Sequence, residues 1–266
     1  MTESGWVRVA LRVMTGLTLA FIYFPLVVLA VYAFNPSRSQ VWPPTGVSLH
    51  WFGEALGNGA MLAAFGTSVV AAAGATAIAL VLGTCAALAV QRYAFFGREA
   101  VSFLLVLPIA LPGVVTGIAL AATFKTIGIT FGLQTIIIGH ATFCVVIAYN
   151  NVIARLRRMP RSAEEASADL GADTWQTFRR ITLPMARTAL MSGALLSFAL
   201  SFDEVIVTNF TAGPGTKTIP LWILSAIQRP NELPVVNVVA LLLILLSVIP
   251  VYFAQRIAGE TAGVTR

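Results

Sequence analysis

Charged residues are scarce in this chain of 266 residues: 11% are Asp, Glu, Lys or Arg, whereas 58% are hydrophobic. Ordinary soluble domains carry about 25% charged residues. With a mean hydropathy of +0.85, this much apolar surface does not fit inside one water-soluble core, so lipid is the expected solvent. The net charge of +6 would suggest nucleic acid for a soluble protein, but here the placement of the charges matters more, and no nucleic-acid partner is expected.

Cysteine and histidine are also rare, with two residues of each. Cys85 and Cys144 lie in apolar runs and are interpreted as small buried hydrophobic residues, not as a disulfide framework or metal ligands. The phosphate-binding loop G-x-x-x-x-G-K-[ST] does not occur, nor do G-x-S-x-G and H-E-x-x-H. These absences argue against an ATPase and a hydrolase. We expect no catalytic residue, metal or cofactor in this chain.

Long apolar runs are abundant, and six of them approach or exceed the roughly 20 residues that a membrane-spanning helix needs. The first follows Arg8 and Arg12 as a signal peptide would, but it is too long for a signal segment and is interpreted as a retained helix. The sequence therefore predicts an all-α integral membrane protein with a six-helix domain over residues 13–254. The expected spans are Val13–Phe34, Met61–Val90, Val101–Phe124, Phe131–Ile153, Met185–Thr208 and Pro234–Ala254.

Basic residues are distributed unevenly between the two ends of these spans, and Lys and Arg prefer the cytoplasmic side of a membrane. The N-terminus (1–12), the segment 155–184 and the C-terminal tail (255–266) are therefore predicted to be cytoplasmic, and the segment 209–233 to lie outside. The richer side carries Arg8, Arg12, Arg92, Arg98, Arg155, Arg157, Arg158, Arg161, Arg179, Arg180 and Arg256, against Arg38, Lys125, Lys217 and Arg229 on the other side.

One compact polar run, EEASADLGADTWQTFRRITLP (164–184), stands out between the fourth and fifth spans. The spacing of Ser162 and Glu165 matches a capping box and predicts a helix start, and Gly171 is placed to end that helix in a left-handed turn. A second helix is predicted to start at Asp173 and to stop near Pro184. Isolated helices need about 12–15 residues even for marginal stability. Both must therefore pack, either on the protein's own spans or in a groove of a soluble partner.

This run resembles the EAA loop of binding-protein-dependent ABC importer permeases, because several residue types agree at fixed offsets, with Ser167 in place of an alanine. The resemblance implies the type I (MetI-like) permease fold and a coupling helix that sits in a cleft of a cytoplasmic ATPase. The coupling residues that it implies are Glu165, Ala166, Ser167, Leu170, Gly171, Ala172, Ile181, Leu183 and Pro184.

The resemblance extends over nearly the whole chain. Within the family, the chain is similar to the second-permease type of the spermidine/putrescine branch. Three runs carry it: GHATFC (139–144), SFDEVIVTNFTAGPG (201–215) and PVVNVVA (234–240). Relatives often carry a proline soon after TFC, where this chain has Val145 and Val146. The resemblance implies a bacterial inner-membrane subunit that forms half of the pathway for a small cationic solute. Its implied partners are a sister permease, two copies of an ATPase that hold ATP and Mg²⁺, and an extracytoplasmic binding protein.

Other cargoes stay open: another amine-bearing or amino-acid-like solute, an opine, a metal chelate or an organic anion. An intramembrane hydrolase and a stand-alone channel are more remote alternatives. Asp203 and Glu204 bear on cargo, because a helix from Met185 reaches Asp203 after roughly 27 Å, near the outer face of the membrane. Acids at such depth usually face a cavity or a partner. One or both carboxylates, Asp203 before Glu204, are expected to hold an ammonium group or, alternatively, to be solvated at a helix end.

Small and helix-breaking residues predict where spans approach closely or bend. The small residues between Gly66 and Gly83 favour close helix packing, and Pro108, Pro112 and Gly113 predict a kink in the third span.

Two further predictions concern the part of the chain expected near the outer face of the membrane. His140 is expected to be a hydrogen-bonded residue at a helix interface. Thr218 followed by Pro220 predicts a short helix whose Trp222 is anchored at the outer membrane surface.

Overall fold

The computed structural model describes the backbone of residues 5–262, and within this range every regular element is a helix. The side chains described are those of residues 5–248 and Tyr252. The chain forms two compact units: one joins the described residues up to Met61 with Ile223–Ile249, and the other joins Leu62–Trp222 with the residues from Pro250 onward. Because the two units are separate bodies, each is described by itself.

The first unit contains α1 (Gly5–Ala33), α2 (His50–Gly57), η2 (Pro230–Glu232) and most of α12 (Leu233–Ala262). The segment between α1 and α2 is organised by Asn35, which is 1% exposed. The indole N–H of Trp51 donates to the carbonyl oxygen of Asn35 over 2.9 Å, and the Asn35 side-chain oxygen accepts from the backbone N–H of Thr45 over 3.3 Å. These bonds join α2 to the chain that leaves α1.

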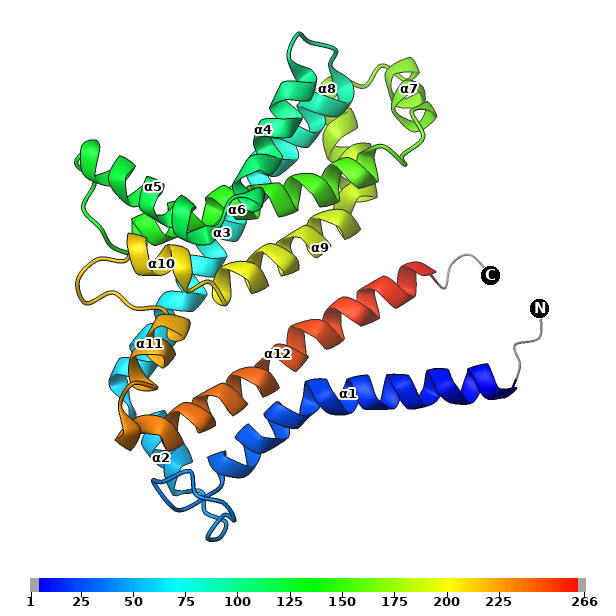
Figure 1. Ribbon diagram of the computed structural model, residues 1–266. Helices are drawn as coiled ribbons and strands as arrows, with labels where there is room; N and C mark the ends of the chain where they lie inside the picture. Colours follow the sequence, from blue (N-terminus) through cyan, green and yellow to red (C-terminus); the bar gives the residue numbers. More distant parts are fainter. Residues whose placement is uncertain (1–4, 263–266) are drawn as a thin grey trace. The chain divides into compact units, whose positions relative to one another are not determined.

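The second unit is built on α3 (Gly59–Arg92), α6 (Leu133–Leu156) and α9 (Leu183–Phe202). Figure 1 shows α6 and α9 side by side, and apolar residues such as Val90 and Val152 pack α3 against α6. The most apolar window of α6 is 61% buried, against 33% for that of α3, so α6 lies at the centre of this unit. Close approach depends on Gly83, where an added Cβ would lie 2.8 Å from Ala148 Cβ and 2.8 Å from Tyr149 N. This confirms the predicted close packing at Gly83, whereas Gly66 has open space around it.

The third expected span is broken in the middle. It consists of α4 (Arg98–Ala110) and α5 (Gly113–Thr126), which meet at an angle of 106° (Figure 1). Pro112 supplies no N–H and disfavours helical backbone at Leu111, which is extended with ψ 143°. The predicted kink is therefore confirmed as a full break, and Val101–Phe124 is not one helix. The described chain has five helices that are long and apolar enough to span a membrane, or six if this pair counts as one.

Two other expected spans have different ends. α9 stops at Phe202, and α10 (Ile206–Thr211) follows after a short break, whereas one helix was predicted to reach Thr208. The cause is Glu204, whose carboxylate takes the N–H of Val207 (2.9 Å) and so offers the backbone an alternative to a continuous helix. α12 continues to Ala262, so the expected tail begins inside a helix, and its last residues, 263–266, lie outside the described range.

The segment 209–233 contains α11 (Ile219–Ala226), as predicted from Thr218 and Pro220, and the N–H of Trp222 donates to the oxygen of Thr218 over 2.8 Å. The expected surface anchoring by Trp222 is wrong, because this side chain is only 3% exposed. The N–H of Ile219 donates to Ser68 Oγ of α3 over 2.8 Å. This bond holds the first turn of α11 against α3. The Trp222 indole is thus covered by protein and not by a membrane surface.

Candidate functional site

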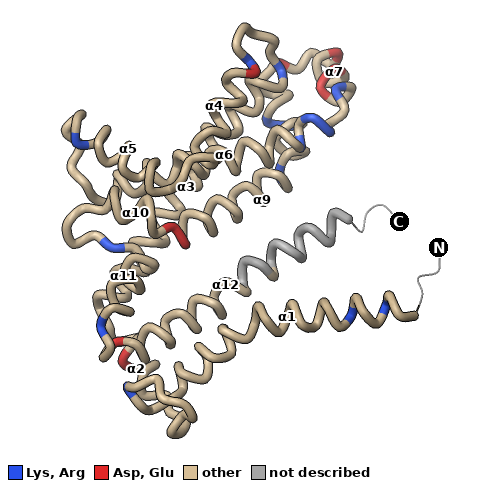
Figure 2. Tube along the Cα trace, in the orientation of Figure 1, with Lys and Arg blue, Asp and Glu red and all other residues tan. Residues whose placement is uncertain are grey.

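The candidate site is the polar segment between α6 and α9, which contains α7 (Ser162–Asp169), α8 (Thr174–Thr177) and the π-helical turn η1 (Phe178–Thr182). Figure 2 shows basic and acidic residues gathered around α7, while the middle of α6 and of α9 carries no charge. The charge of the second unit is therefore concentrated at one end of its long helices.

The start of α7 differs from the predicted capping box. The helix begins at Ser162, its capping position is Arg161, and no side chain caps it. Arg161 already has helical backbone angles (φ −65°, ψ −26°), so Ser162 falls inside the first turn, where its hydroxyl does not bond the third N–H. The backbone N–H groups of Glu164 and Glu165 both donate to the oxygen of Arg161 over 3.0 Å. Both glutamates lie in the first turn, where the helix dipole favours them.

The corner between α7 and α8 follows the sequence prediction. Gly171 has φ +79°, a left-handed conformation that glycine adopts without steric cost. Asp173 then caps α8, because its side chain accepts the N–H of Gln176 over 2.7 Å. The hydroxyls of Ser167 and Thr177 share a hydrogen bond of 3.0 Å that ties the two short helices together.

The second short helix does not stop near Pro184, and that prediction is wrong. α8, η1 and α9 run on as one apolar helical segment, Thr174–Phe202. The chain makes room for the proline by widening to a π-helical turn just before it, in which the N–H of Leu183 bonds the oxygen of Phe178. Pro184 then falls in the first turn of α9, where its missing N–H matters least.

The residues expected to meet an ATPase are mostly open to solvent. Leu170 is 89% exposed and Trp175 is 65% exposed, and the Trp175 ring contacts Phe178 with a centroid distance of 5.6 Å. Large apolar side chains this exposed on a polar segment are a feature of interaction sites. Of the coupling set, the exposed members are Glu165, Ala166, Leu170, Gly171, Leu183 and Pro184, and the half-buried members are Ser167, Ala172 and Ile181.

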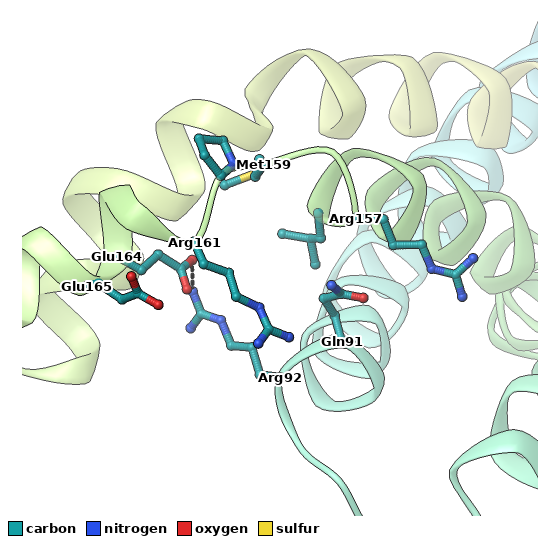
Figure 3. A pocket seen from close by; sticks show the side chains of 9 residues that line it. Gln91, Arg92, Arg157, Met159, Arg161, Glu164 and Glu165 are labelled. Carbon is teal, nitrogen blue, oxygen red and sulfur yellow. Dashed lines mark hydrogen bonds and ion pairs between the residues drawn. The ribbon is translucent and has the colours of Figure 1, made fainter.

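A polar cluster that the sequence did not reveal joins α3, α7 and η1. Arg92, the last residue of α3, forms an ion pair with Glu164 in the first turn of α7 (Figure 3). The same Arg92 nitrogen donates to Thr182 Oγ1 over 2.7 Å, and that hydroxyl donates to Glu164 Oε1 over 2.8 Å. The sequence indicated only a topology role for Arg92. No local pattern links residues so far apart in the sequence.

Beside this cluster lies a cavity of about 360 Å³ between the ends of α3 and α6 and the start of α7. Figure 3 shows the side chains of Arg92, Arg157 and Arg161 around it, with Glu164 and Glu165 on the side of α7. An apolar cluster that includes Val90, Val152 and Leu156 packs α3 against α6 behind this cavity, so the open space lies between these helix ends and α7. The full lining is Gln91, Arg92, Leu156, Arg157, Met159, Pro160, Arg161, Glu164 and Glu165.

The two acids expected on a solute path have different surroundings. Glu204 is half buried, and its carboxylate accepts the N–H of Val207 (2.9 Å). Asp203 follows the last residue of α9 and is exposed. Its side chain makes no hydrogen bond or ion pair with the part of the chain that the structure describes. Asp203 is thus the more exposed of the two, and its place on a solute path stays a prediction.

His140 is a buried hydrogen-bonded residue, as predicted. Its side chain is 0% exposed. Nδ1 lies 2.7 Å from Ser201 Oγ of α9, and Nε2 lies 2.8 Å from Thr208 Oγ1 of α10. Both partners flank the break between α9 and α10, so His140 holds α6 to the two helix ends on either side of Asp203.

Comparison with known proteins decides the family. A family model described as "Binding-protein-dependent transport system inner membrane component" matches residues 79–260. The chain belongs to this family. The putrescine transport system permease protein PotI of Escherichia coli (strain K12) is 37% identical over 252 residues, covering 92% of this chain and 87% of PotI. The spermidine/putrescine transport system permease protein PotC of Haemophilus influenzae (strain ATCC 51907 / DSM 11121 / KW20 / Rd) is 34% identical over 242 residues. The match covers 91% of this chain and 93% of PotC.

Solved structures confirm the fold class. A chain in the crystal structure of a bacterial ABC transporter for import of the acidic polysaccharide alginate matches with a TM-score of 0.74 and 16% identity, covering 98% of this chain and 99% of its own. A second structure of an alginate transporter, with a periplasmic protein bound to an alginate pentasaccharide, also matches with a TM-score of 0.74, at 15% identity. The resemblance and the all-α importer-permease fold are confirmed. The chain is a transport subunit of the inner membrane and not an enzyme.

Proposed function

We propose that this chain forms half of the translocation pathway of an ATP-driven importer for polyamines such as putrescine and spermidine. The observation that carries the cargo assignment is the similarity to two polyamine permeases, which is 37% and 34% identity over about nine-tenths of the chain. The other half of the pathway is a sister permease. Two copies of a cytoplasmic ATPase hold ATP and Mg²⁺, and this chain binds neither.

The polar segment supports a coupling role. Leu170 is 89% exposed and Trp175 is 65% exposed, although both are large and apolar. A soluble partner with an apolar cleft gives these side chains a place to be buried, in the manner of a helix bound in a groove. We assign that partner as the ATPase, and Gly171 as the corner that presents Leu170 to it.

The distribution of basic residues supports an orientation. Arg8 and Arg12 lie on α1 near the N-terminus, and four arginines precede or start α7. Lys and Arg favour the cytoplasmic side. The N-terminus, the polar segment and the C-terminus therefore lie in the cytoplasm, while α11 faces an extracytoplasmic binding protein.

Asp203 supports a cationic cargo. It is an exposed acid at the end of a membrane-spanning helix, next to the break between α9 and α10. Its side chain has no cationic partner in the described part of the chain. An acid at membrane depth is costly unless it meets water, a partner or a ligand. A primary ammonium group on its way inward is a suitable counter-charge.

A second candidate is the same machinery with a different amine-bearing solute. The observation in its favour is that the fold alone does not set cargo, since the alginate transporter has this fold and imports an acidic polysaccharide. Such a solute also carries a cationic group for Asp203 to attract. The cargo therefore depends on the binding protein as well as on this chain.

The test is reconstitution of the complete transporter in proteoliposomes, with the sister permease, the ATPase and the binding protein. We expect ATP-dependent uptake of radiolabelled putrescine or spermidine, and competition between them. A neutral sugar and an alginate oligosaccharide serve as control solutes. Uptake of a control solute with no uptake of either polyamine would overturn the cargo assignment. Polyamine uptake by this chain without an ATPase would overturn the coupling assignment.

A further inference from the structure

We propose that Arg92, Glu164 and Thr182 form a mechanical clamp that passes movement of α7 to the ends of α3 and α9. The clamp is a closed triangle of three atoms. Arg92 Nη2 is ion-paired to Glu164 Oε1 and donates to Thr182 Oγ1 over 2.7 Å, and Thr182 Oγ1 donates to Glu164 Oε1 over 2.8 Å. The inference rests on the proposed function, because it requires that α7 is moved by an ATPase.

The clamp joins three elements that are distant in sequence. Arg92 ends α3, Glu164 is in the first turn of α7, and Thr182 ends η1, directly before α9 begins at Leu183. Figure 3 shows Arg92 and Glu164 facing each other across the side of the cavity. A displacement of α7 is therefore felt at two membrane-spanning helices through one set of side chains.

The clamp matters because it joins α7 directly to the end of α3. The main packing partners of α7 in the described chain are α8 and η1. On the side of α3 there is instead a cavity of about 360 Å³. α3 is also linked to this segment through α6, since Val90 packs against Val152. The Arg92 side chain adds a direct connection from α7 to α3 at the edge of the cavity.

The burial of the cluster separates it from an ordinary surface ion pair. Ion pairs that are fully exposed to water contribute little to stability. Here the side chains of Arg92 and Glu164 are only 23% and 29% exposed, and Thr182 is 1% exposed. Loss of Arg92 leaves the Glu164 carboxylate partly buried without its cation, which costs more than the pair itself contributes.

The neighbouring charges provide matched controls. Glu165 is next to Glu164 but is exposed, and it is assigned to the ATPase contact instead. Arg157 lines the same cavity as Arg92, is exposed, and makes no ion pair in the described part of the chain. Arg157→Gln therefore removes a positive charge from the same place and leaves the clamp complete.

The experiment measures solute taken up per ATP hydrolysed by the complete transporter in proteoliposomes. We expect Arg92→Glu and Glu164→Arg each to lower this ratio about tenfold, a usual size for a coupling effect, while the ATPase still co-purifies. The combined exchange should restore a large part of the ratio, because it rebuilds the pair with reversed charges. Arg157→Gln should leave the ratio unchanged.

Two milder variants guard against misfolding. Arg92→Lys keeps the charge and should retain most of the ratio, whereas Thr182→Val keeps the shape, removes the hydroxyl and should lower it. A normal ratio in Arg92→Glu and Thr182→Val, or additive losses in the exchanged pair, would overturn the clamp. Failure of the unmutated subunit to co-purify with an ATPase would instead overturn the proposed function, so the two failures are distinguishable.

Discussion

The carboxylate of Glu204 accepts the backbone N–H of Val207 over 2.9 Å, and this bond begins α10 just after α9 has ended. Asp203, one residue earlier, is exposed and bonds no described residue through its side chain. Two adjacent acids that look equivalent in the sequence therefore have separate tasks. Glu204 shapes the backbone, and Asp203 presents its charge.

The first prediction separates these tasks by substitution. Asp203→Asn should raise the polyamine concentration needed for half-maximal uptake several-fold, because the ammonium loses its counter-charge, while the amount of assembled transporter is unchanged. Glu204→Gln keeps an oxygen for the N–H of Val207 and should be mild. Glu204→Ala removes the acceptor of the Val207 N–H, a lost hydrogen bond that costs about 0.5–1.5 kcal/mol, and should lower thermal stability. Equal uptake kinetics in Asp203→Asn and the unmutated protein would remove Asp203 from the path.

The second prediction concerns the corner at Gly171. Gly171→Arg should leave membrane insertion intact but weaken ATPase co-purification and transport. A non-glycine residue at φ +79° costs about 1–2 kcal/mol, and the long side chain would project into the partner.

Gly128 is the matched control for this change, because it also has positive φ (+74°) and open space around its Cα but lies outside the polar segment. Gly128→Arg carries the same backbone strain and should retain the ATPase. Equal loss of the ATPase in both variants would mean that strain alone explains the effect.

The third prediction concerns the packing of α3 on α6. Gly83→Ala places a methyl group 2.8 Å from Ala148 Cβ and 2.8 Å from the backbone nitrogen of Tyr149. Overpacking of this kind costs about 1–3 kcal/mol. We expect a lower midpoint of thermal unfolding in detergent, whereas Gly66→Ala, which meets nothing within 4 Å, should have no such effect. An unchanged midpoint for Gly83→Ala would contradict the close approach.

The fourth prediction compares the two histidines. His140→Ala leaves the hydroxyls of Ser201 and Thr208 without their shared partner and should destabilise the protein by roughly 1–3 kcal/mol, since each is buried. His50→Ala removes a side chain that is 67% exposed and should change stability by less than about 0.5 kcal/mol. Unfolding in detergent, followed by tryptophan fluorescence, measures both. Similar small effects would mean that the His140 bonds are replaced by water.

Local signals in the sequence predicted what short-range physics controls. Apolar length located the spans, Gly171 marked the left-handed corner, and Asp173 marked the start of α8. Errors arose where a neighbouring element changed the outcome. The helix passes Pro184 because the preceding turn widens to a π-helix, and Arg161 takes the capping position expected for Ser162.

Contacts between residues that are distant in the sequence could not be predicted from local patterns. Nothing around Arg92 indicates that it meets Glu164, since the partner is set by the way α3, α6 and the polar segment pack together. His140 could be expected to need hydrogen bonds, but Ser201 and Thr208 become its partners only because α9 breaks between them. The coupling residues could be proposed from the sequence because their spacing within one short segment is itself the signal, and their role stays a prediction.

The 106° turn at Leu111 and Pro112 has a consequence for hydration. A helix that ends in mid-span leaves its last carbonyl oxygens without intrahelical donors, and hydrocarbon offers none. Donors from a neighbouring subunit or from water must therefore reach the C-terminal end of α4. The corner at Leu111 and Pro112 is therefore the place in the assembled transporter to look for a water-filled passage, or for a contact that closes it.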